Sequence, residues 1–233
     1  DKSHGAAWTS QDGRKWRKSH RLPPWYFYRA IPLADGTVLA SRGTTQGCSR
    51  MWRLEPDGRV RKAGLIWPSK RDCPKRTEVV ALAGRPGAGM VAVYGGLGRA
   101  DRPEVVARAP GARWEHVRVP GLGQAFGSPV AIAETASGFV LVAEAKDAIR
   151  AWRSPDGREW TNFEPLPDSM VDRRREYAPT STIDAAERDI LLVLASPDQV
   201  WRSVAGGPFE SVGPLAARVE HDESRLVGAA LTD

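Results

Sequence analysis

Arginines and aromatic residues that lie outside any repeating pattern are the side chains of this sequence best suited to bind a ligand. A guanidinium pairs with a carboxylate through two parallel hydrogen bonds, and an aromatic ring stacks on the apolar face of a sugar. The candidate ligand-binding residues are Trp25, Tyr28, Arg29, Arg42, Trp67, Arg71, Arg76, Arg99, Arg173 and Tyr177. Trp67 stands beside Lys70 and Arg71, and we expect it to be an exposed anchor.

The sequence contains no motif that assigns a catalytic residue or a cofactor. The four histidines are scattered without metal-ligand spacing and neither cysteine belongs to a CxxC pair, so we expect no metal site. A glycoside hydrolase would need a pair of acidic residues, and the nearest candidates are Glu134, Asp184 and Glu220. No motif surrounds them, so we assign no catalytic residue and expect no cofactor.

A segment that recurs along the chain indicates which elements must position these side chains. Residues 8–16, which begin and end with Trp, reappear as residues 152–160. Weaker copies with the same spacing begin at residues 52, 106 and 201, so successive copies start 44, 54, 46 and 49 residues apart. Self-similarity at such a period is typical of folds that repeat one supersecondary unit.

Each copy predicts two short strands joined by a tight turn, because Asp-Gly or Gly-Gly between apolar positions supplies the positive φ of a hairpin turn. A second, more apolar hairpin lies between successive copies. Four strands in every 44 to 54 residues predict an all-β fold, a five-bladed β-propeller of four-stranded blades that forms a single domain over residues 1–233. The predicted blades are residues 29–63, 78–119, 129–166 and 181–215, and a last blade closed by two strands from each terminus, residues 218–231 with 6–22.

Seven of the nine Trp residues belong to the repeat, and we expect them to fill the space between adjacent blades. They are Trp8, Trp16, Trp52, Trp114, Trp152, Trp160 and Trp201. Trp25 and Trp67 are left over. An alternative to a binding role for residues 25–28 is that their rings close the end of the central channel, while the arginines form a solvated surface.

The turn of the two best-preserved copies resembles the Asp-box of the bacterial neuraminidase repeat, which occurs in sialidase-like propellers. The matching residues are Ser10, Asp12, Gly13 and Trp16 in one copy and Ser154, Asp156, Gly157 and Trp160 in the other. Both copies have one residue fewer between the Ser and the aromatic residue than the usual box. In that family the box is structural and lies on the face opposite the active site, so the resemblance implies a propeller fold and assigns no catalytic residue.

Loops that join the second strand of a blade to the third share one face of a propeller with loops that join one blade to the next. In this chain they are the long loops, and most of the formal net charge of +6 falls within them. Cys48 and Cys73 lie in two of these loops, and we predict a disulfide between them, with Cα atoms no more than about 7 Å apart. A disulfide would favour an oxidising, extracytoplasmic compartment.

Two classes of partner are disfavoured. The longest apolar run, Ile190–Ala195, has six residues against the roughly 20 that a membrane span needs, so no span is expected. Nucleic acid is not expected, because acidic residues interleaved with the arginines weaken binding to phosphates. These acidic residues are Asp72, Glu78, Asp101, Glu104, Asp172 and Glu176.

Together these observations predict a secreted, non-catalytic binding propeller that recognises carbohydrate or a protein partner, in particular an acidic one, through its basic and aromatic loop face. The alternative is a sialidase-like or other glycoside hydrolase with its site at the channel mouth. The chain could also be one part of a larger polypeptide or complex, because the termini of a closed propeller lie side by side.

Overall fold

The structure, a computed structural model, is built from antiparallel β-sheets. It describes residues 8–9, 17–18, 29–32, 37–42, 49–71, 77–85, 89–96, 103–122, 130–135, 137–145, 148–162, 181–185, 189–194, 199–204 and 209–214. This part of the chain contains no α-helix. No membrane-spanning helix is therefore found among the described residues.

Four of the sheets have four strands each, and neighbouring strands in a sheet are consecutive in the chain. The first sheet contains β3 (Arg29–Pro32), β4 (Val38–Arg42), β5 (Arg50–Leu54) and β6 (Val60–Leu65). The second contains β7 (Thr77–Arg85), β8 (Gly89–Gly96), β9 (Glu104–Arg108) and β10 (Glu115–Val117). The third contains β11 (Val130–Thr135), β12 (Gly138–Ala145), β13 (Ala148–Ser154) and β14 (Thr161–Asn162). The fourth contains β15 (Ser181–Ala185), β16 (Asp189–Leu194), β17 (Gln199–Val204) and β18 (Phe209–Pro214).

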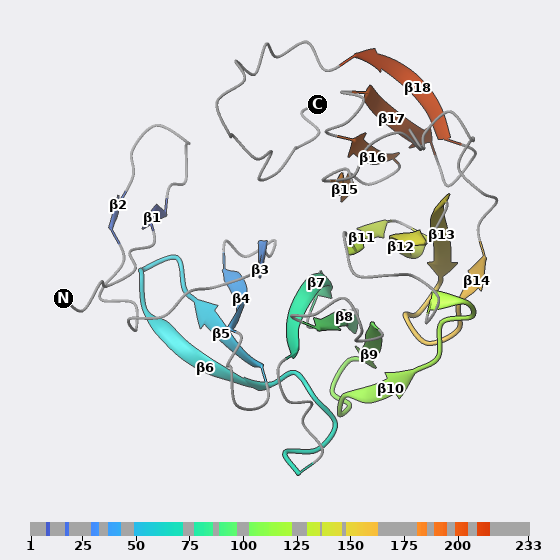
Figure 1. The fold of residues 1–233 in the computed structure, drawn as a ribbon. Helices are drawn as coiled ribbons and strands as arrows, with labels where there is room; N and C mark the ends of the chain where they lie inside the picture. Colours follow the sequence, from blue (N-terminus) through green and yellow to red (C-terminus); the bar gives the residue numbers. More distant parts are fainter. Residues whose placement is uncertain are drawn as a thin grey trace.

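The four sheets are arranged around a common centre as blades of a β-propeller (Figure 1). The first strand of each blade lies toward the centre and the fourth lies at the rim (Figure 1). Neighbouring blades meet at their first strands, since β3 contacts β7, β7 contacts β11, and β11 contacts β15. The all-β class and the propeller architecture predicted from the repeat are therefore confirmed.

A fifth, two-stranded sheet precedes these blades and consists of β1 (Trp8–Thr9) and β2 (Arg17–Lys18). It is the outer hairpin that the first copy of the repeat predicts. The inner hairpin expected to complete its blade, residues 218–231, lies outside the described residues. Closure by strands from both termini, and with it the number of five blades, stays a prediction.

Strands β8 and β9 of the second blade carry buried apolar residues on both sides because each side packs against a neighbouring blade. Successive side chains of a strand point to opposite faces of the sheet. In β8, Val91 and Val93 therefore belong to a cluster shared with the third blade, whereas Ala92 and Tyr94 belong to a cluster shared with the first. An uninterrupted apolar run in a short strand is typical of such two-sided burial.

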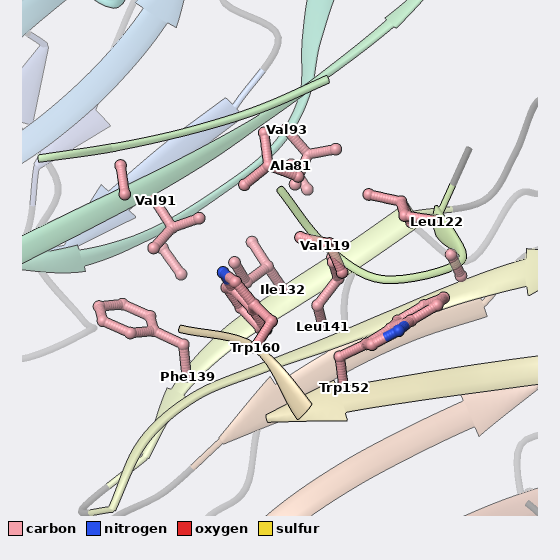
Figure 2. Packing of buried hydrophobic residues seen from close by; sticks show 14 residues of the cluster. Ala81, Val91, Val93, Val119, Leu122, Ile132, Phe139, Leu141, Trp152 and Trp160 are labelled. Carbon is pink, nitrogen blue, oxygen red and sulfur yellow. The ribbon is translucent and has the colours of Figure 1, made fainter. Parts of the chain in front are cut away.

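The cluster between the second and third blades is the largest part of the described core. Figure 2 shows Val119 and Leu122 of the second blade's connector facing Leu141 and Trp152 of the third blade. Trp152 is 0% exposed and Trp160 is 5% exposed. Trp114 lies in the other cluster, and Trp52 is also buried.

The predicted packing role is thus confirmed for these four repeat tryptophans. The side chains of Trp8, Trp16 and Trp201 lie outside the described residues.

Candidate functional site

One end of the blades carries the segments that lead from one blade to the next. Because consecutive strands of a blade run in opposite directions, these connectors leave from the same end as the loops between second and third strands. The described connectors are residues 66–71, after β6, and residues 118–122, after β10. We call this end the connector face and include in it the adjoining strand ends at Arg50, Glu104 and Arg150.

The first connector is fixed to the second blade by a buried hydrogen bond. The Tyr94 hydroxyl on β8 donates to the carbonyl oxygen of Ile66, which is 0% exposed. The Ile66 N–H donates to the Ser49 carbonyl at 3.1 Å, which ties the connector to its own blade as well. Burial raises the pKa of Tyr94, so its hydroxyl keeps the proton that it donates.

Trp67 lies inside this junction, and the expectation that it is an exposed anchor is wrong. Its side chain is only 5% exposed. Its ring packs edge-on against Tyr94, with centroids 4.8 Å apart, and against His116, with centroids 4.7 Å apart. Residues 65–67 are consecutive apolar residues, and an apolar connector that crosses between blades is buried by the blade it reaches. The apolar run at residues 65–67 is the feature of the sequence that could have predicted the burial of Trp67.

The second connector is held in the same way by the third blade. Trp152 Nε1 on β13 donates to the Pro120 carbonyl oxygen at 2.7 Å. Val119 and Leu122 of the connector are buried, and the Leu122 N–H donates to the Val119 carbonyl at 3.3 Å. In both junctions an aromatic donor of the following blade binds a carbonyl of the connector, so both connectors have a defined geometry.

Exposed cations gather on this face. Lys70 and Arg71 follow the buried Trp67, Arg118 opens the second connector, and Arg150 lies next to Gly121 of that connector. Among the described residues, no carboxylate pairs with any of these four cations. The described part of the face therefore presents an uncompensated positive charge.

Among the described residues of the connector face, Glu104 is the carboxylate that lies close to a basic side chain, that of His116. His116 Nδ1 lies 3.8 Å from Glu104 Oε2, and both side chains are about half exposed. In the sequence, His116 has no metal-ligand spacing to another histidine and no evident partner. The hairpin around residue 111 pairs Val106 with His116 and thereby brings Glu104 close to His116. The register of the predicted hairpin could therefore have indicated this contact.

A small pocket opens beside this pair, where β9 and β10 cease to be hydrogen-bonded. Their ladder ends at the Val105–Val117 pair. The cavity at this end of the ladder has a volume of about 190 Å³ and is lined by residues 103–105, residues 116–119 and Leu122. Glu104, His116 and Arg118 border the cavity.

The other predicted binding residues are only partly placed. Arg71 is exposed on the connector face. The backbone of Arg29 opens β3 opposite Ser41, and Arg42 ends β4 opposite Arg50, so both lie at the connector-face end of the first blade. Trp25, Tyr28, Arg76, Arg99, Arg173 and Tyr177 lie outside the described residues, as do Cys48, Cys73, Ser10, Asp12, Gly13 and Trp16. Within the described part of the chain, no cluster of His, Cys, Asp and Glu could hold a metal ion.

The turn at residues 154–160 lies at the opposite end of the third blade and binds itself. The Gly157 N–H donates to Ser154 Oγ at 2.8 Å, and Trp160 Nε1 donates to the Gly157 carbonyl at 2.8 Å. Burial raises the pKa of Asp156, but hydrogen bonds from the N–H groups of residues 158 and 159 and from Ser154, with the charge of Arg158, outweigh it and hold that pKa below its ordinary value.

The same turn also joins two blades. Arg158 forms an ion pair with Glu115 of β10 in the second blade. Ser154, Asp156 and Arg158 thus bond within the turn or with this neighbour, which indicates a structural role for the turn.

Solved structures that resemble this chain have low sequence identity to it. A streptogramin B lyase structure has a TM-score of 0.56 at 11% identity, and the match covers 91% of this chain and 62% of that chain. A mutant of AofleA from Arthrobotrys oligospora has a TM-score of 0.55 at 12% identity, with coverages of 84% and 60%. TolB from Acinetobacter baumannii has a TM-score of 0.53 at 10% identity, with coverages of 90% and 49%.

The chain thus spans between 49% and 62% of the length of these structures. At such identity the similarity shows the β-propeller fold alone. A scan against protein-family models finds no match, and a search of curated proteins finds no similar sequence.

Proposed function

We propose that this chain is a non-catalytic β-propeller that binds an acidic protein partner through the connector face. The observation that carries the proposal is the group of four exposed cations, Lys70, Arg71, Arg118 and Arg150, for which the described residues offer no acidic partner. Complementary charge across an interface increases the rate of association and selects among partners.

The connectors that carry three of these cations are already ordered by their hydrogen bonds to the following blade. A partner would therefore bind without ordering these segments, and the entropic cost of association is smaller for a preorganised surface.

We favour a protein partner over a carbohydrate because the burial of Trp67 removes one of the predicted aromatic platforms for a sugar. A ring that is 5% exposed cannot stack on a sugar, and Trp67 was the sequence's principal candidate for an exposed aromatic anchor. Guanidinium and ammonium groups that pair with no acid among the described residues suit the carboxylates of an acidic protein surface, which require no aromatic platform.

Reversing two charges of the connector face should weaken binding to an acidic polypeptide about tenfold, or ~1.4 kcal/mol. The variant is Arg71→Glu with Arg118→Glu, and the probe is poly-L-glutamate in an equilibrium binding assay at physiological salt. The matched control, Arg61→Glu with Arg113→Glu, changes two exposed arginines outside this face and alters the net charge equally. We expect the control to bind within about twofold of the wild type.

Equal losses in the two double variants would mean that only net charge matters and would overturn the proposal. Heparin serves as the second probe. If the wild type bound heparin and not poly-L-glutamate, the partner would be an anionic glycan instead.

We also propose an extracytoplasmic location, which the predicted Cys48–Cys73 disulfide supports. A second addition is that residues 8–16 and 152–160 both form a shortened Asp-box. The hydrogen bonds within residues 154–160 support the second. A crystal structure tests both. It should show a disulfide between Cys48 and Cys73, and a hydrogen bond from the Gly13 N–H to Ser10 Oγ. Two free thiols would contradict the extracytoplasmic location. A different turn at residues 10–13 would contradict the Asp-box.

A further inference from the structure

The pocket at the end of the β9–β10 ladder has the size and the walls of a site for a single side chain. Its volume of about 190 Å³ lies below the roughly 300–1,000 Å³ of pockets that enclose drug-sized ligands. At protein interfaces, pockets hold the few anchor residues that contribute most of the binding free energy.

The inner wall of the pocket is apolar and rigid. Val105 is 3% exposed, Val119 is 7% exposed and Leu122 is 3% exposed, and all three belong to the cluster that the second and third blades share. Figure 2 shows Val119 and Leu122 above Leu141 and Trp152. Since the connector is also tied to Trp152 through Pro120, the wall exists before any partner binds.

The rim of the pocket is polar and connects it to the cations of the connector face. Arg118 borders the cavity, and Arg150 lies beside Gly121, three residues further along the same connector. Glu104, whose carboxylate lies 3.8 Å from His116, also borders the cavity, whereas Arg118 pairs with no carboxylate among the described residues. The pocket therefore combines apolar side chains in its interior with two cations, Arg118 and Arg150, and one carboxylate, Glu104, near its edge.

We propose that this pocket is the anchor point of the interaction: it takes one large apolar side chain from an acidic segment of the partner, while neighbouring carboxylates of that segment bind Arg118 and Arg150. This inference rests on the proposed function and adds to it the residue type that must accompany the acids. Charge complementarity selects an acidic segment, and the apolar wall selects one apolar side chain within it.

Two synthetic peptides test the proposal: eight Asp and Glu residues with a central Phe, and the same peptide with a central Ser. We expect the Phe peptide to bind wild-type protein about tenfold more tightly. Methyl NMR provides a second readout that needs no variant, and the Val105, Val119 and Leu122 methyl signals should shift with the Phe peptide only. Val117→Phe, which fills the pocket, should abolish the preference for Phe and leave binding of the Ser peptide unchanged.

The outcomes separate this inference from the proposed function. If neither peptide binds, the connector face does not bind acidic polypeptides and both ideas fail. If both bind equally, or if the Phe peptide binds more tightly without shifting the pocket methyls, the proposed function stands and the anchor pocket is overturned.

Discussion

Gly138→Ala is expected to destabilise the protein by about 2–5 kcal/mol. Gly138 opens β12 with a φ of +122°, a conformation that residues with a Cβ rarely adopt. A Cβ at this position would lie 2.2 Å from the Ser154 carbonyl oxygen and 2.6 Å from the Pro155 Cα. Both are backbone atoms at the start of the 154–160 turn, so they cannot move aside without displacing that turn.

Gly64→Ala is the matched control for the clash. Gly64 has a φ of +114°, close to that of Gly138, but a Cβ added there would have no atom within 4 Å. Gly64→Ala should lose about 1–2 kcal/mol of unfolding free energy, the cost of placing a Cβ on a backbone with positive φ, without the cost of a clash. Urea unfolding of the two variants separates the two contributions, and equal losses would show that the Ser154 and Pro155 contacts place no constraint on Gly138.

Trp152→Ala is expected to cost about 3–5 kcal/mol of unfolding free energy. Trp152 is 0% exposed in the cluster between the second and third blades, and its removal leaves a cavity that rigid strands on both sides cannot close. It also deprives the Pro120 carbonyl of its donor.

Trp152→Phe tests the hydrogen bond from Trp152 Nε1 to the Pro120 carbonyl more selectively than Trp152→Ala. It keeps a six-membered aromatic ring in the cluster and removes the five-membered pyrrole ring that carries the N–H. We expect a smaller loss of about 1–3 kcal/mol, measured by urea unfolding beside Trp152→Ala. If the unfolding free energy of Trp152→Ala lay within about 1 kcal/mol of the wild-type value, Trp152 would not be the core anchor of the second connector.

Local patterns were enough to predict the elements that lie within one blade. The spacing of Trp152 and Trp160 around an Asp-Gly turn predicted a hairpin, and the apolar runs between copies predicted the inner strands. Such features follow from hydrogen bonds and turn conformations among residues close in sequence, so the sequence contains the necessary information.

Contacts between blades were beyond such patterns. Trp67 and Trp152 are both indoles beside charged residues, yet their roles depend on what the next blade places against them. Trp67 is buried because Tyr94 and His116 cover it, and these residues are 27 and 49 positions away in the chain. The pairing of Glu104 with His116 and the pocket beside them likewise depend on where one ladder ends.

The sequence by itself determined that this chain forms a propeller of antiparallel hairpins, with Trp52, Trp114, Trp152 and Trp160 of its repeat packed inside, and it places most of the net positive charge in the segments between strands. Only the tertiary structure decided which loop residues face solvent. Exposure is a property of packing between segments far apart in the chain: it removed Trp67 from the candidate surface and left Lys70, Arg71, Arg118 and Arg150 upon it.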